Sequence, residues 1–157
     1  MREYFKELDT PIYQLRIEMT ENDGGGSVWI GIQTANGTRL HVTDLFMQMG
    51  TVASARSSQI EIRDSSGNMF KRFASSSLNS NEFFSMGLGS DGVSNKTPLH
   101  PFTIANGDKI IFRASNLANN ETYQVYVRGY IRGRLPTTST AGSSNTPATN
   151  TIYARII

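Results

Sequence analysis

Residues 123–134 read YQVYVRGYIRGR, and the pattern of these residues indicates the fold class. Successive side chains of an extended strand point to opposite faces of a sheet. One face of this segment therefore carries Tyr123, Val125, Val127, Gly129 and Ile131. The other face carries Tyr126, Arg128, Tyr130, Arg132 and Arg134. We expect a strand over about residues 122–132, with one face in the core and a ribbon of tyrosine and arginine on the other.

The same alternation recurs along most of the chain, whereas helical periodicity is hard to find after the first ten residues. Turn signals separate the runs, among them three consecutive glycines at 24–26 and the Asn-Gly pairs at 36–37 and 106–107. We expect strands at 12–19, 28–33, 39–46, 59–63, 69–73, near Phe83, and at 102–104, 109–114 and 122–132. The sequence therefore predicts an all-β protein with about eight strands.

Long Ser/Gly-rich connections at 50–58, 74–81 and 87–101 separate some of these runs. Such irregular spacing favours an antiparallel two-sheet sandwich, jelly-roll-like, over an evenly spaced up-and-down barrel. We expect the β-sandwich domain to span residues 12–134. An N-terminal arm or short helix (1–11) and an extended C-terminal tail (135–157) would flank it.

The two ends differ in composition from this body. Tyr4, Phe5 and Leu8 have helical spacing, and such an apolar side needs a partner surface. Residues 135–150 contain no charged side chain and consist mainly of Thr, Ser, Asn, Ala and Pro. A segment of this composition cannot bury enough apolar surface to fold alone. A neighbouring subunit is the simplest agent that would order this tail. A crystal contact or the domain's own edge would also serve, with Tyr153, Ile156 and Ile157 in a final strand.

The amino-acid composition limits which catalytic and metal-binding chemistry the chain can carry. The 157 residues are enough for one domain with a sizeable core, and there is no cysteine, so disulfides, thiolate nucleophiles and Cys-type zinc sites are excluded. His41 and His100 are the only histidines, and no nucleophile, zinc-protease or phosphate-loop motif accompanies them. We therefore expect that the protein is not an enzyme and that it has no catalytic residue, no cofactor and no bound metal. Glu21, Asp23 and Asp91 fit acidic turns better than a calcium site.

Membranes and nucleic acids are not expected as partners. No apolar run approaches the ~20 residues needed to cross a bilayer, and the first residues lack the apolar core of a secretion signal. The net charge is only +2, with −3 over residues 1–64 and +5 over residues 65–157, and neither end has a basic arm. We expect synthesis in a cytoplasm.

The tyrosine and arginine ribbon is the main candidate site, because these residue types are enriched at protein interfaces. An ordinary solvated sheet face with cross-strand arginine pairs is the alternative. Trp29 could be a sugar-stacking platform beside Tyr126, but a packed or rim aromatic is the favoured explanation. The predicted interface comprises Tyr4, Phe5, Tyr126, Arg128, Tyr130, Arg132, Arg134, Tyr153, Ile156 and Ile157.

Four segments carry a resemblance to a known group of proteins: HVTDLF (41–46), IEIRDSSG (60–67), FTIANGDKIIF (102–112) and TYQVYVRGY (122–130). In strand order and turn placement, residues 12–134 resemble small accessory capsid proteins of tailed bacteriophages. The resemblance implies a decoration, cement or other virion protein whose termini reach across neighbouring shell subunits.

Together these observations favour a structural virion protein, made in the host cytoplasm and located in the virion. Its partners would be identical subunits, with a trimer as one option, and capsid or tail proteins. The alternative is a carbohydrate- or receptor-binding β-sandwich module of a fibre. In that case Trp29, Tyr126 or Tyr130 would stack against a glycan.

Overall fold

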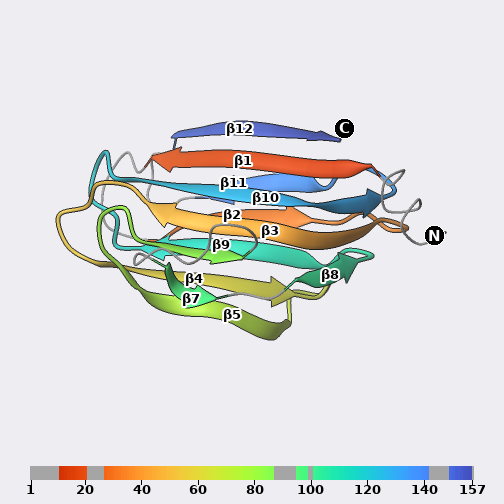
Figure 1. The fold of residues 1–157 in the computed structure, drawn as a ribbon, viewed down its shortest axis with the longest axis horizontal. Helices are drawn as coiled ribbons and strands as arrows, with labels where there is room; N and C mark the ends of the chain where they lie inside the picture. Colours follow the sequence, from red (N-terminus) through yellow and green to blue (C-terminus); the bar gives the residue numbers. More distant parts are fainter. Residues whose placement is uncertain (1–10, 21–26, 87–94, 99–100, 142–148, 157) are drawn as a thin grey trace.

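The computed structural model describes residues 11–20, 27–86, 95–98, 101–141 and 149–156. This part of the chain is all-β, and its strands form the two layers of a β-sandwich (Figure 1). The strands are β1 (Ile12–Thr20), β2 (Ser27–Gln33), β3 (Arg39–Met49), β4 (Arg56–Arg63), β5 (Met69–Leu78), β6 (Phe83–Met86), β7 (Asn95–Pro98), β8 (Phe102–Ala105), β9 (Lys109–Ser115), β10 (Thr122–Arg132), β11 (Thr137–Ala141) and β12 (Thr149–Ile156).

The strands divide into two sheets. Sheet A has the order β12-β1-β10-β3-β6-β7, with β8 also paired to β3. Sheet B has the order β11-β2-β9-β4-β5. The pairs are antiparallel except for the short parallel pair of β6 and β7. The expected all-β, antiparallel two-sheet sandwich is therefore confirmed.

The core lies between the sheets and is built from alternate residues of their strands. In β1, β9 and β10 buried side chains alternate with more exposed ones, as the sequence pattern predicts. A hydrogen bond also links the two sheets, because the buried hydroxyl of Tyr123 donates to the carbonyl of Val28 at 3.0 Å. Burial raises the pKa of the Tyr123 phenol, so the hydroxyl keeps the proton that it donates.

Several strands differ from the expected pattern, and the described residues form twelve strands where about eight were expected. β5 continues to Leu78 through a segment expected to be a connection, because its serines pair with β4. β4 begins at Arg56, within another expected connection, and residues 95–98 form β7 within the third. Backbone pairing along a sheet edge tolerates small polar side chains that carry no alternating apolar signal.

The structure also differs from the expected extended tail. β11 pairs with β2 and β12 pairs with β1, so both segments are edge strands of the sandwich itself. The domain's own edge was one of the three expected ways to order this polar segment, and it is the one that the structure shows. The backbone groups of β11 and β12 complete hydrogen bonds that β2 and β1 would otherwise leave open, and such pairing requires no apolar side chains. The predicted N-terminal arm, with Tyr4 and Phe5, lies outside the described residues, as does Ile157.

Candidate functional site

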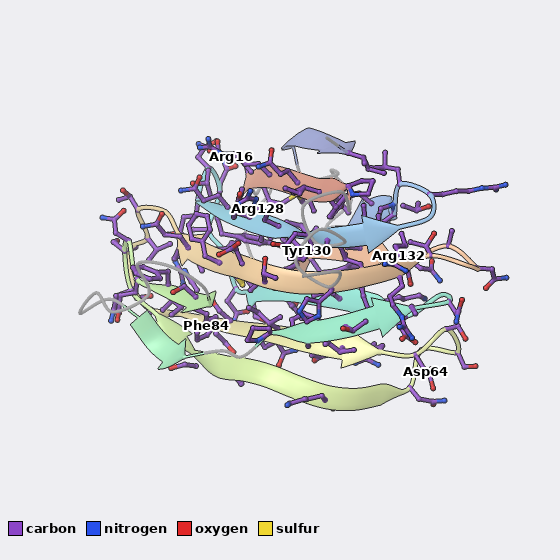
Figure 2. All side chains as sticks on the ribbon, turned by 45° about the vertical axis from the view of Figure 1, so that its right-hand side comes forward. Arg16, Asp64, Phe84, Arg128, Tyr130 and Arg132 are labelled. Atoms are coloured by element: carbon purple, nitrogen blue, oxygen red, sulfur yellow. The ribbon has the colours of Figure 1, made fainter. Side chains whose placement is uncertain are left out.

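β10 lies in the middle of sheet A, between β1 and β3. Its residues Tyr123, Val125, Val127 and Ile131 are buried in the core. Tyr126, Arg128 and Tyr130 alternate with them and are half-buried, which places them on the outer face of sheet A. Figure 2 shows Arg128, Tyr130 and Arg132 following one another along this strand. The ribbon expected from the sequence is thus one side of a central strand.

Contacts across the strands hold this face in place. The rings of Phe46 and Tyr126 have centroids 6.1 Å apart and planes inclined by 50°. Beside them, the Gln124 side-chain amide donates to Gln48 at 2.9 Å, and Arg16 donates to Gln124 at 3.3 Å. The outer face is therefore a connected layer spanning β1, β10 and β3.

A β-bulge in β3 interrupts this regular pairing. Arg128 lies opposite Asp44 and Gly129 lies opposite Val42, so Thr43 is the extra residue. Val42 is buried, whereas Thr43 and Asp44 are both partly exposed. The Thr43 hydroxyl lies 3.1 Å from Asp44 Oδ2 and 3.4 Å from the Arg128 carbonyl, and can donate to either. The bulge thereby brings two consecutive polar side chains beside Arg128, a re-aiming for which bulges are known.

Gly129 is required by the close approach of β3 to β10. A Cβ atom at Gly129 would collide with the carbonyl oxygen of His41 and would lie 3.0 Å from Val42 Cα. Both of these neighbours are backbone atoms, which cannot move aside as a side chain can. This explains a glycine within the interior of a strand.

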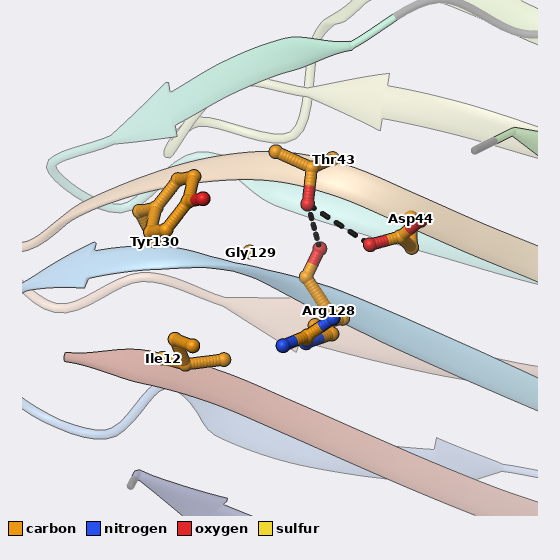
Figure 3. A pocket seen from close by; sticks show the side chains of 6 residues that line it. All are labelled: Ile12, Thr43, Asp44, Arg128, Gly129 and Tyr130. Atoms are coloured by element: carbon orange, nitrogen blue, oxygen red, sulfur yellow. Dashed lines mark hydrogen bonds between the residues drawn. The ribbon is translucent and has the colours of Figure 1, made fainter. Parts of the chain in front are cut away.

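The bulge and the glycine border a hollow of about 230 Å³ on the outer face (Figure 3). It is lined by Ile12, Thr43, Asp44, Arg128, Gly129 and Tyr130. The Arg128 Nε atom is buried and has no hydrogen-bond partner in the structure. Among the residues drawn in Figure 3, the hydrogen bonds run from Thr43 to Asp44 and to the Arg128 carbonyl, and none joins the Asp44 and Arg128 side chains. The hollow therefore presents one cation and one anion that are not bonded to each other.

The remaining predicted interface residues are distributed differently. Arg132 lies opposite Arg39 at the end of β10, and Arg134 is exposed just beyond the strand. In β12, Tyr153 lies opposite Arg16 in the register. Ile156 lies opposite Tyr13 and is 39% exposed. The structure therefore joins the β10 residues into one face but leaves Arg134 outside the strand.

The suggested stacking platform of Trp29 beside Tyr126 is wrong. Val28 and Ile30 of β2 are fully buried, so the half-buried Trp29 between them lies on the outer face of sheet B. There its ring crosses the position of Gly31, where an added Cβ would lie 3.1 Å from Trp29 Cζ3. Tyr126 belongs to the opposite side of the sandwich. Strand alternation separates the two faces of one strand but does not tell which sheet the strand joins.

The sequence reasoning also missed Ile12, Thr43 and Asp44 as site residues. A signal for the last two was present: Val42 and Leu45 are separated by two polar residues, so the alternation changes phase between them. Such a change is what an inserted bulge residue produces.

A second arginine and carboxylate meet at one end of the sandwich. Arg56 Nε donates to Glu121 Oε1 at 2.7 Å, and a terminal nitrogen donates to Oε2 at 2.9 Å. The backbone N–H groups of Ala118 and Ala53 also donate to Glu121, at 2.8 and 2.9 Å. The Arg56 hydrogen bonds, supported by these backbone donors and opposed by burial, lower the pKa of Glu121 to about 2. We call this arrangement the Glu121 clamp.

The described ranges also bear on metal binding and on membrane insertion. These residues contain no group of three or more histidine, aspartate or glutamate side chains arranged to hold a metal ion. No helix within them combines the length and apolar character that a membrane crossing needs.

Comparison with known proteins adds no assignment to this geometry. The sequence matches no known protein family and no curated protein.

Proposed function

We propose that this chain is a structural protein of a virus particle, of the decoration or cement kind, that binds its neighbours through the outer face of sheet A. The observation that carries the proposal is the composition of that face. Half-buried Tyr126, Arg128 and Tyr130 lie together on the central strand, with Phe46 against Tyr126. Tyrosine and arginine supply much of the binding energy in protein interfaces, because they bury large areas while keeping polar ends.

The contacts within the face favour binding energetically. Association restricts side chains that were free to rotate, and this opposes binding by about 0.5–1.5 kcal/mol for each one that becomes fixed. Tyr126 already packs on Phe46, and Gln124 already bonds to Gln48 and Arg16. A partner that docks here would therefore restrict fewer side chains than on an unsupported surface.

The strand order supports a jelly-roll assignment within the sandwich. β1-β10-β3-β6 in one sheet faces β2-β9-β4-β5 in the other, and the edge strands β12 and β11 extend the two sheets. Eight strands in two such sheets make a jelly roll, an architecture used by viral capsid and lectin domains among others. The fold is compatible with the proposed role, but the role rests on the face.

Two contacts were expected from the sequence, the termini and the tyrosine and arginine sheet face, and we keep only the second for the partner. β11 and β12 are paired to β2 and β1, so the C-terminal segment is already occupied within its own chain. We therefore place binding to identical subunits, or to capsid and tail proteins, on the outer face of sheet A.

Virus particles purified from the natural source provide the first test. Quantitative mass spectrometry of these particles should detect the chain in many copies per particle. Its absence from particles, with accumulation only in the soluble fraction of the producing cells, would overturn the proposal.

Variants then locate the contact. Particles stripped of the chain are incubated with purified chain and sedimented, and the bound fraction is measured. Tyr126→Ala should weaken binding more than about tenfold, as expected for a central interface residue. Gln59→Ala, at a half-buried position in β4 of sheet B, is the matched control and should bind as wild type does. Equal binding of both variants would exclude the outer face of sheet A as the contact.

A further inference from the structure

We propose that the hollow beside the β3 bulge binds a single neutral sugar ring. The ligand would be held between the side chains of Asp44, Arg128 and Tyr130 (Figure 3). This goes beyond the structural role, because it assigns a small-molecule ligand to one part of the outer face.

The size of the hollow sets the size of the ligand. Pockets for drug-sized ligands usually have volumes of roughly 300–1,000 Å³. At about 230 Å³, this hollow is smaller than that range. It can accept one six-membered ring with its hydroxyl groups, and a nucleotide or an oligosaccharide would extend well beyond it.

The charges of the hollow favour a neutral ligand. An anion bound to Arg128 would lie next to the Asp44 carboxylate, and a cation bound to Asp44 would lie next to the Arg128 guanidinium. Either arrangement brings like charges together, which opposes binding. Hydroxyl groups avoid this conflict, because each one can donate to a carboxylate and accept from a guanidinium. Adjacent hydroxyls on a sugar ring match the two side chains at once.

The polar groups that line the hollow are positioned to form hydrogen bonds with such a ligand. Arg128 Nε is buried without a hydrogen-bond partner, a state that is costly unless a ligand or water supplies an acceptor. The Thr43 hydroxyl lies within bonding distance of Asp44, so the carboxylate is oriented before a ligand arrives. Figure 3 shows the Tyr130 hydroxyl directed toward Gly129 and Thr43, where it adds a third polar group.

The remaining walls complement the C–H surface of a sugar. Ile12 contributes an aliphatic wall, and the Tyr130 ring contributes an aromatic one. A few placed polar groups among apolar walls are the usual composition of a small-molecule site.

Saturation-transfer NMR on the full chain tests the proposal by comparing neutral sugars with charged sugars and with a zwitterion. The probes are the methyl glycosides of glucose, galactose, mannose and N-acetylglucosamine, together with glucuronate, glucosamine and glycine. At least one neutral glycoside should bind with a dissociation constant in the millimolar range, and more tightly than glucuronate or glucosamine. Absence of binding by all four glycosides, or stronger binding of a charged probe or of zwitterionic glycine, would overturn it.

Matched variants locate the bound sugar. Asp44→Ala and Arg128→Lys should each weaken binding by about tenfold, because each removes a hydrogen bond to a charged group. Arg16→Lys, at an exposed position of β1 outside the hollow, should bind as wild type does. Circular dichroism confirms that each variant is folded. Sugar binding that survives in both hollow variants would place the site elsewhere and overturn the proposal. The particle-binding test of the structural role is independent of this result.

Discussion

The Glu121 clamp and the hollow each place an arginine beside a carboxylate, with opposite results. In the clamp, both oxygens of Glu121 accept hydrogen bonds from Arg56, and the two side chains are only 9% and 13% exposed. In the hollow, Asp44 and Arg128 are opposite each other in the register of β3 and β10, but no hydrogen bond joins their side chains (Figure 3). The closed pair can stabilise only the fold, whereas the open pair retains bonding capacity for another molecule.

The largest expected effect comes from the glycine that borders the hollow. Gly129→Ala should lower the free energy of unfolding by more than about 4 kcal/mol, because the new methyl group would meet the backbone of β3. Urea unfolding followed by circular dichroism measures the loss.

Gly31→Ala in sheet B is the control for that substitution. Its methyl group would meet only the side chains of Ser139 and Trp29, at 3.1 Å, and these can shift. We expect a loss of no more than about 1 kcal/mol. Similar losses in the two variants would show that β3 does not limit the space at Gly129.

Breaking the closed pair should have the next largest effect. Glu121→Ala leaves the Arg56 charge without its carboxylate in a largely buried position. Removing one partner of a buried ion pair usually lowers stability by about 3–5 kcal/mol, and we expect the lower end of that range. Chemical unfolding at neutral pH measures it. A loss below about 1 kcal/mol would mean that the clamp contributes no more than a surface ion pair.

The clamp should also make stability depend on pH. The Glu121 pKa falls from an ordinary 4.5 to about 2 in the folded chain, so the folded state favours the ionised form. The stabilisation, about 3 kcal/mol, is complete above about pH 5 and is lost as the pH falls from 4.5 through 2. The difference in unfolding free energy between wild type and Glu121→Gln should therefore shrink steadily over this window. A constant difference would contradict the lowered pKa.

The smallest effect is expected at the open pair. Asp44→Ala removes a partly exposed carboxylate near the Thr43 hydroxyl, so we expect a stability loss of less than about 1 kcal/mol. Thermal unfolding of wild type, Asp44→Ala and Glu121→Ala under the same conditions compares the two carboxylates directly. A loss at Asp44 as large as that at Glu121 would remove the distinction between them.

Local alternation was sufficient to predict much of the fold. The buried and half-buried sides of β10 follow directly from the order of Val, Tyr and Arg in its sequence, and the same holds for Leu15 and Arg16 in β1. These assignments depend on one strand at a time. The part of the candidate face that β10 contributes could therefore be predicted from residues 123–134 alone.

Features that depend on distant pairing could not be predicted in this way. The bulge at Thr43 is defined only by its register with Arg128, and the clamp joins Arg56 to Glu121. β11 was missed and β12 was expected only as one alternative, because their polar composition has no apolar periodicity, although their backbones pair fully with β2 and β1. Strand propensity and apolar alternation depend on the side chains of one segment, whereas these features depend on which distant segments pair through their backbones.

The position of β1 has a consequence for how the chain acquires its fold. β1 has β10 and β12 as neighbours, so Leu15 pairs with Val127 and Ala154. On a ribosome, this strand would wait until roughly a hundred further residues had emerged before its first lateral partner arrived, and such distant pairing makes folding slow. During that interval its apolar side would be exposed in the cell, so a nascent chain of this topology is a natural client for chaperones.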